Sequence, residues 1–93
     1  MPGPPEAEVT SMPEEVLRLR AVIDEVASSI APSEAVEVRG LLAAGEAQLA
    51  LEQLVRFLFD RDVAVPGWVK DEIAVLADRY GSPREGLDTM PVR

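Results

Sequence analysis

The longest apolar pattern in the chain runs from Gly45 to Asp60 and predicts its central helix. At about 100° per residue, apolar side chains that recur every three or four positions fall on one face of a helix. Polar side chains fill the opposite wedge, so this stretch predicts a helix at the centre of a small bundle. Its expected core face consists of Ala47, Leu51, Leu54, Val55 and Leu58, widened by Ala50, Phe57 and Phe59.

The N-terminal helix is predicted from Ser11 to Ala31. Ser11 stands three residues before Glu14, which is the spacing of a capping box, and Pro13 is tolerated in a first helical turn. The helix is expected to end at Ala31, because the residue before a proline is disfavoured in helical conformation. Its core stripe follows the helical period and consists of Val16, Leu19, Ile23, Val26, Ala27 and Ile30.

A second helix is predicted between Ser33, a favourable N-cap, and Gly45, which suits the left-handed residue that follows a helix end. Gly40 inside this helix costs about 1 kcal/mol relative to alanine. A close crossing of another helix at that point would explain its presence. The expected buried side consists of Ala35, Val38, Leu41 and Leu42.

The last helix is predicted from Trp68 to Tyr80, with Gly81 as its left-handed cap. A Pro-Gly turn precedes it. Residues 63–65 are expected to form an extended connector rather than a strand, because they stand directly before Pro66 and have no evident partner strand. The expected core face consists of Val69, Ile73, Leu76, Ala77 and Tyr80.

Four helices joined by short turns predict an all-α fold, a small and mostly antiparallel four-helix bundle. The bundle is expected to occupy residues 11–81 of the 93-residue chain. Residues 1–10 are rich in proline and have little to bury, so we expect a disordered leader there. Residues 82–93 carry few apolar side chains, and we expect them to form a short flexible tail that folds back weakly at most.

The missing residue types exclude several kinds of chemistry. With no histidine and no cysteine, the chain lacks the commonest general base and the usual zinc, haem and thiolate ligands. Adjacent carboxylates such as Asp71 and Glu72 point about 100° apart on a helix and do not form a catalytic pair. The pair Asp60 and Asp62 is out of register for a calcium loop, because Val65 stands where that loop needs glycine. We therefore expect no enzymatic activity, no cofactor and no metal site.

The net charge of −8 bears on the choice of partners. A chain this acidic repels phosphate backbones, so we expect no direct nucleic-acid binding. No apolar run reaches the roughly 18 residues of a membrane span, and the proline-rich start lacks the pattern of a secretory signal. The cytoplasm is the expected location. The charge either attracts a basic protein surface or only keeps the protein soluble.

Carboxylates on or near the connector and the last helix are the candidates for partner binding. They form either one acidic patch or an ordinary charged rim. Glu52 and Arg56 stand at the i, i+4 spacing of a helix-stabilising ion pair. Trp68 is either a lid on the core or an anchor for a partner. The candidate partner-binding residues are Asp60, Asp62, Asp71, Glu72 and Asp78.

The step Gly45-Glu46, followed by Leu49-Ala50-Leu51-Glu52 and Leu54, resembles the MafI-type immunity proteins of bacterial polymorphic toxin systems. In that family a polar turn, a short apolar stretch and a last helix ending near a glycine follow. They correspond here to residues 60–62, 63–65 and 68–81, so the resemblance covers about half of the chain. It implies a small cytoplasmic protein that protects its own cell by occupying a cognate toxin domain, often a nuclease.

A basic toxin domain would be the natural partner of an acidic helical surface, because charge complementarity speeds encounter and favours the cognate partner. The alternative is a helical adaptor or homodimeric structural subunit without enzymatic activity. An exposed apolar strip of Leu49 with Phe57 or Phe59 would favour that alternative. In either case we expect a monomer or a weak homodimer.

Overall fold

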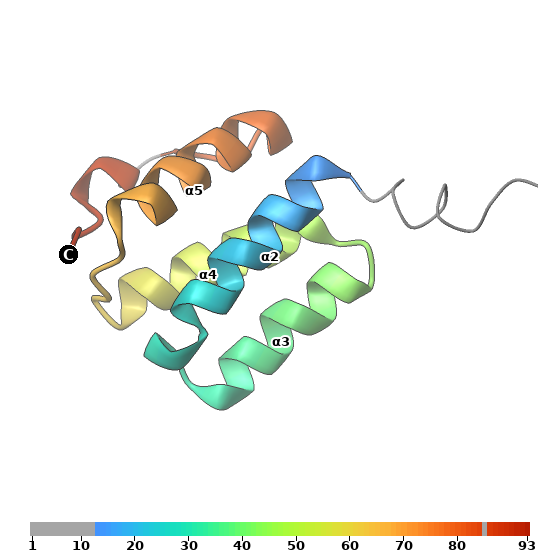
Figure 1. The fold of residues 1–93 in the computed structure, drawn as a ribbon, viewed down its shortest axis with the longest axis horizontal. Helices are drawn as coiled ribbons and strands as arrows, with labels where there is room; N and C mark the ends of the chain where they lie inside the picture. The colour runs from blue at the N-terminus through green and yellow to red at the C-terminus, as the bar shows by residue number, and fades with distance from the viewer. Residues whose placement is uncertain (1–12, 85) are drawn as a thin grey trace, which may run out of the picture.

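The computed structural model describes residues 13–84 and 86–93, and within them the protein is an all-α domain of four helices (Figure 1). Successive helices run in alternate directions, as the short connections predicted. The leader expected at residues 1–10 lies outside the described residues. The helices are α2 (Glu14–Val26), α3 (Pro32–Ala43), α4 (Ala47–Asp60) and α5 (Gly67–Tyr80), with 3₁₀ turns at Ala27–Ser29 and Leu87–Thr89.

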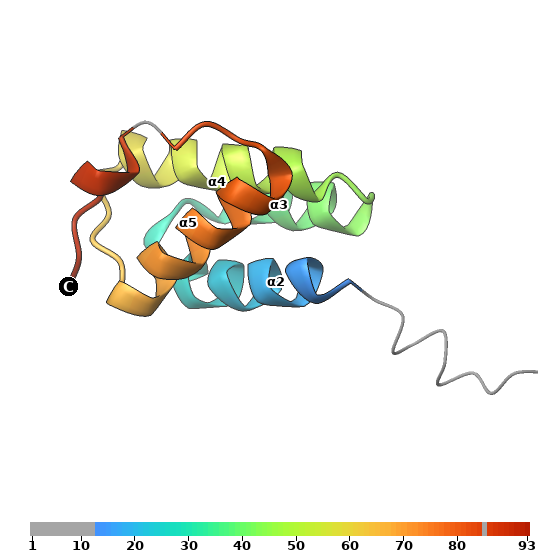
Figure 2. The same ribbon diagram turned by 90° about the horizontal axis from the view of Figure 1, so that it is seen from above.

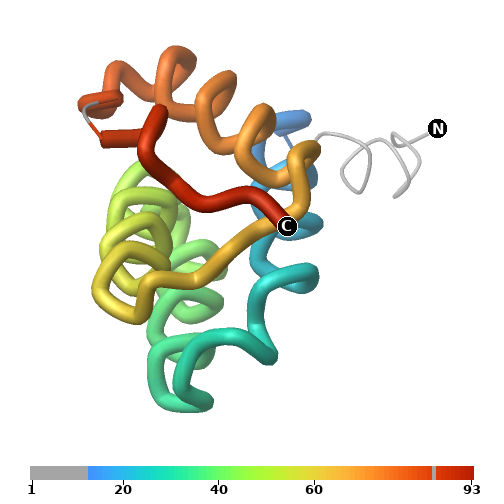
Figure 3. The backbone as a smooth tube through the Cα atoms, turned by 90° about the vertical axis from the view of Figure 1, so that its left-hand side faces the viewer, coloured from blue at the N-terminus to red at the C-terminus, as the bar shows by residue number. Residues whose placement is uncertain are grey.

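Two helices share the centre of the bundle. Helix α4 packs against α2, α3 and α5, and α2 likewise packs against each of the other three. Helices α3 and α5 lie on opposite sides of this central pair (Figure 3). Figure 2 shows α2 and α4 in separate layers. The predicted central position of α4 is therefore confirmed, and α2 shares it.

The core follows the predicted faces closely. Leu51, Leu54 and Leu58 of α4 are at most 1% exposed, and so is Ala50. The two phenylalanines of α4 are only partly buried and pack against the edge of this core. Val22, which the predicted stripe of the first helix omitted, is fully buried. A helix packed against three others buries a wider arc than a single stripe, which explains this difference.

Proline, rather than serine, sets the start of the first two helices. Helix α2 begins at Glu14 after Pro13, so it is shorter than the predicted Ser11–Ala31, and Ser11 lies outside the described residues. Helix α3 begins at Pro32, with Ala31 rather than Ser33 in the N-cap position. Its first turn is closed by the Glu34 carboxylate, which accepts the Ala31 N–H at 2.9 Å. Proline occupies the first helical position without losing a hydrogen bond, because that N–H has no partner within the helix.

The glycines divide into two kinds. Gly45 and Gly81 have φ of +82° and +66°, so both predicted left-handed helix ends are confirmed. Gly40 does not mark a close helix crossing, because a Cβ atom built there would meet nothing within 4 Å. The suggested packing reason for Gly40 is therefore wrong.

The segment after Gly81 is part of the folded domain, and the prediction of a weakly attached tail is wrong. Leu87 and Met90 are 5% and 2% exposed. The backbone of Val65 in the connector pairs with this segment, donating to Pro91 O and accepting from Arg93 N, both at 2.9 Å. Figure 3 shows the segment crossing between α4 and α5 beside the connector. The connector thus has a backbone partner that its sequence did not reveal, but this is an isolated bridge, and the expected connector rather than a strand is confirmed.

Candidate partner-binding surface

The five candidate carboxylates occupy three different settings. Asp60 ends α4 and Asp62 lies in the following turn with φ of +54°, and both are exposed. Among the described residues, the Asp60 side chain makes only a long contact of 3.9 Å with the exposed Arg56. The Asp62 side chain makes no hydrogen bond or ion pair with any other described residue. These two carboxylates are free to meet a partner at the α4 end of the connector.

Glu72 is partly buried and pairs with Arg18 of α2. Arg18 Nε donates to Glu72 Oε1 at 2.7 Å, and Arg18 Nη2 donates to Oε2 at 2.5 Å. The two side chains are 27% and 23% exposed, so solvent screens this bidentate pair only in part. The hydrogen bonds from Arg18 lower the pKa of Glu72 below its ordinary value. This pair joins α2 to α5, which makes Glu72 the least available of the five candidates.

Asp71 and Asp78 lie on the outer side of α5 together with two exposed apolar residues. Trp68, Asp71, Val75 and Asp78 are spaced by three, four and three residues, which places them on one helix face. We call these four residues the α5 stripe. Trp68 is 46% exposed and Val75 is 37% exposed, so Trp68 is not a lid on the core. The helical period alone is enough to find this stripe in the sequence, because positions 68, 71, 75 and 78 form a second helix face beside the core face.

The two acidic residues of the α5 stripe differ in their surroundings. Asp78 accepts two hydrogen bonds of 3.1 Å from Arg84 Nη1, and both residues are exposed. Asp71 makes no side-chain bond to any other described residue and is exposed. A basic partner would therefore meet Asp71 directly and would compete with Arg84 for Asp78.

Glu52 does not pair with Arg56 as the i, i+4 spacing predicted. Its Oε2 instead accepts a hydrogen bond of 2.8 Å from Ser82 Oγ and one of 3.2 Å from Gln48 Nε2. Ser82 is the buried polar residue of the C-terminal segment. Glu52 thus fastens that segment to α4, a role that depends on a contact 30 residues away.

One further carboxylate has a structural role at the start of α3. Arg61 Nε donates to Glu34 Oε1 at 2.6 Å, and the same oxygen accepts the Ala31 N–H. The hydrogen bond from Arg61 is the largest cause that lowers the pKa of Glu34, and the hydrogen bond from the Ala31 N–H is the second. Arg61 follows α4, so this pair ties the end of α4 to the start of α3.

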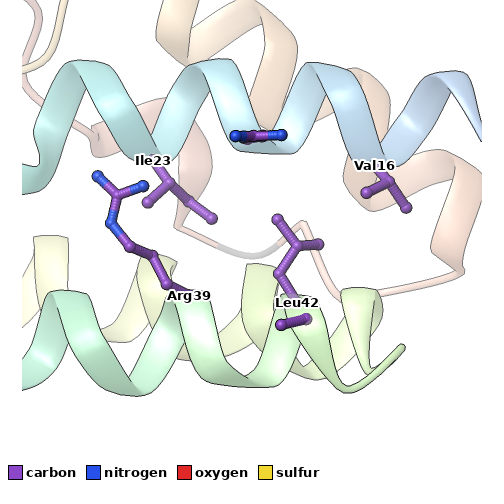
Figure 4. A pocket seen from close by; sticks show the side chains of 6 residues that line it. Val16, Ile23, Arg39 and Leu42 are labelled. Atoms are coloured by element: carbon purple, nitrogen blue, oxygen red, sulfur yellow. The ribbon is translucent and has the colours of Figure 1, made fainter. Parts of the chain in front are cut away.

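Two shallow cavities lie between helices in the described part of the chain. One, of about 350 Å³, lies between α2 and α3 (Figure 4). The other, of about 320 Å³, lies between α4, α5 and the C-terminal segment, and Glu52 and Ser82 are among its lining residues. Within residues 13–84 and 86–93, no group of three or more acidic residues is placed to hold a metal ion.

Comparisons with models of known protein families, with curated proteins and with solved structures return no match for this chain. Across the part of the chain that the structure describes, every helix is too short or too polar to cross a membrane. The class of the protein is therefore a small all-α domain. Its resemblance to MafI-type immunity proteins stays a prediction.

Proposed function

We propose that this protein is a non-enzymatic immunity protein that binds a basic toxin domain through the α5 stripe and the neighbouring connector. The observation that carries this proposal is the half-exposed Trp68 on the same helix face as the free carboxylate of Asp71. Tryptophan is one of the residues most enriched at interface hot spots.

The net charge supports a basic partner. A charge of −8 on 93 residues attracts a positively charged domain at long range, and the free carboxylates of Asp62 and Asp71 then favour a matching orientation. A nuclease-type toxin presents lysine and arginine to hold phosphates, so an acidic protein can occupy that surface by charge complementarity. Such a neutralising protein would act in the cytoplasm of the cell that makes the toxin.

The experiment is a pull-down with the tagged full chain from its native cells, followed by identification of the captured protein and a toxicity assay. We expect a stoichiometric basic protein whose expression is toxic and whose toxicity is relieved by co-expression of this chain. Recovery of this chain alone from cells shown to express toxin domains would contradict the proposal. Capture of a non-toxic protein would favour a helical adaptor.

Variants of the captured complex test whether the α5 stripe is the interface. We expect Trp68→Ala to weaken binding by about 30-fold, the equivalent of about 2 kcal/mol for a hot-spot aromatic. Asp71→Lys should slow association, most clearly at low salt. Glu37→Lys, an exposed charge reversal on α3, is the matched control and should weaken binding much less than Asp71→Lys. Equal effects of Asp71→Lys and Glu37→Lys would show that only net charge matters.

The homodimer alternative has less support from the geometry. Leu49 is 41% exposed, but Phe57 and Phe59 pack against the core. The apolar strip that would favour a dimer through α4 is therefore interrupted. Sedimentation of the full chain at micromolar concentration should give a monomer, and a stable dimer would favour the structural-subunit alternative.

A further inference from the structure

The groove between α2 and α3 has an apolar floor and two arginines. Val16, Ile23 and Leu42 contribute its apolar side chains, and Ile23 is fully buried at its base (Figure 4). Arg39 lies beside Ile23 in the same view, and Arg20 and Ala43 complete the lining. The cavity has a volume of about 350 Å³. We call it the α2/α3 groove.

The charge of this groove is opposite to that of the whole molecule. The chain has 17 acidic residues and a net charge of −8, yet none of the carboxylates in residues 13–84 and 86–93 lines the groove. Arg39 reaches Asp24 at 2.7 Å at the edge, and both side chains are about half exposed. Arg20 is exposed and makes no side-chain bond to any other described residue. Among the described residues, two arginines thus stand against one carboxylate at the groove, so the groove is apolar and weakly basic on an acidic protein.

Exposed apolar residues extend the groove outward along both helices. Val36 is 70% exposed and precedes Arg39 by three residues and Ala43 by seven, so it shares their face of α3. Leu17 is 50% exposed and precedes Arg20 by three residues on α2. Two parallel walls with apolar rims suit an amphipathic helix lying lengthwise, which is a common mode of peptide recognition.

We propose that the α2/α3 groove is a docking site for an acidic amphipathic helix of a partner protein. Apolar side chains of that helix fill the space above Ile23, and its flanking carboxylates pair with Arg20 and compete with Asp24 for Arg39. Among the described residues of the lining, only Ile23 is fully buried. Because most of the lining is open to solvent, the groove would not enclose a small molecule as a ligand pocket does. A helix, in contrast, would cover the groove along its length.

This site is independent of the proposed toxin interface. On α2, Arg18 faces α5 through Glu72, and Arg20 stands two residues further, about 200° away around the helix. The α5 stripe and the α2/α3 groove therefore lie on different sides of α2. Their charges also differ, so each side selects a partner segment of the opposite charge.

Synthetic peptides of about four helical turns test the proposal. The acidic probe carries leucines at i, i+3, i+4 and i+7 flanked by glutamates, and its counterpart carries lysines in place of the glutamates. Neither contains tryptophan, because Trp68 is the single tryptophan of the protein and its fluorescence then reports on the α5 stripe alone. Methyl NMR signals of Val16, Ile23 and Leu42 report on the groove.

We expect the acidic peptide to shift the three groove methyl signals saturably and to leave the Trp68 fluorescence unchanged. The double variant Arg20→Glu/Arg39→Glu should weaken this binding by about tenfold or more, since two favourable charge contacts become repulsive. Arg56→Glu is the matched control, because Arg56 is an exposed arginine on α4 and does not line the groove. Melting temperatures of all variants show whether the fold is kept.

Three results would overturn the proposal. One is the absence of groove shifts with the acidic peptide at millimolar concentration. Another is equal binding of the acidic and basic peptides in the groove, which would indicate apolar contact without charge selection. The third is a shift of the groove signals on dilution of the protein alone, because the occupant would then be a second copy of this chain.

Discussion

Arg18 and Glu72 form the least exposed ion pair among the described residues. Through this pair, two charged side chains connect helices α2 and α5. A pair of this kind, more than two-thirds shielded on each side, is screened less than the exposed pairs around it. Its two hydrogen bonds fix the approach of α2 to α5. Removing one partner leaves the other, partly shielded charge without its hydrogen bonds, and we expect this to cost more than the loss of a solvated pair.

The first prediction concerns the acid stability of the domain. Folding lowers the pKa of Glu72 below its ordinary value of 4.5, chiefly through the hydrogen bonds from Arg18. The stabilisation is therefore complete above about pH 4.5 and is lost as the pH falls through the folded-state pKa. Glu72→Gln should lower the melting temperature at neutral pH and flatten its fall on acidification, measured by circular dichroism.

Glu37→Gln is the control for this prediction, because Glu37 is an exposed glutamate on α3 without a side-chain bond to another described residue. It should leave the melting temperature and its pH dependence nearly unchanged. Glu34 contributes acid sensitivity of the same sign, since Arg61 and the Ala31 N–H lower its pKa too. An unchanged pH profile in Glu72→Gln would show that the pair with Arg18 is not formed in solution.

At the scale of the helices, Gly40 and Gly81 should respond in opposite ways to the same substitution. Gly40 lies inside α3 with open space around it, so Gly40→Ala should stabilise the domain by about 1 kcal/mol through helix propensity. Gly81 has φ of +66°, and Gly81→Ala should destabilise it by about 1 kcal/mol, because alanine is strained there. Urea unfolding measures both changes, and a destabilised Gly40→Ala would reveal a contact at that face.

Periodicity predicted the helices well, because their core faces repeat every three or four residues over three or more turns. Helix starts were less predictable. Ser11 and Ser33 are good caps by residue type, yet α2 and α3 begin after Pro13 and at Pro32. At both starts, proline has a fixed φ and follows or forms part of an extended backbone, and this favours a helix start at proline over one capped by serine. The preferences of single residues do not show which of the two starts is adopted.

The candidate site was predictable only where it depends on one helix. The outward position of Asp71 and Asp78 follows from the period of α5 alone. The pairing of Glu72 with Arg18 joins residues 54 positions apart, and the bond between Glu52 and Ser82 joins residues 30 apart. Residue spacing along a helix gives no information on such contacts, because they depend on which helices become neighbours.

At the scale of the whole molecule, the C-terminal segment completes the core. Leu87 lines the space between α4 and α5 together with Leu51 and Ile73. Lys70 Nζ donates to the carbonyl oxygens of Asp88 and Met90, both at 3.1 Å, which holds the last turn against α5. Leu87 and Met90 are isolated apolar residues in a polar stretch, so no periodic pattern predicted their burial. The space between α4 and α5 that Leu87 lines exists only after the helices have packed.

The last prediction tests this contribution of the C-terminal segment. Leu87 is 5% exposed, so Leu87→Ala should lower the free energy of unfolding by about 2 kcal/mol, the lower part of the range for buried leucines. Val92 lies in the same segment but is 51% exposed, and Val92→Ala should change it by less than about 0.5 kcal/mol. Denaturant unfolding gives both values. Equal small effects would mean that the segment is not anchored in solution, whereas the expected difference would make residues 86–93 an integral part of a domain this small.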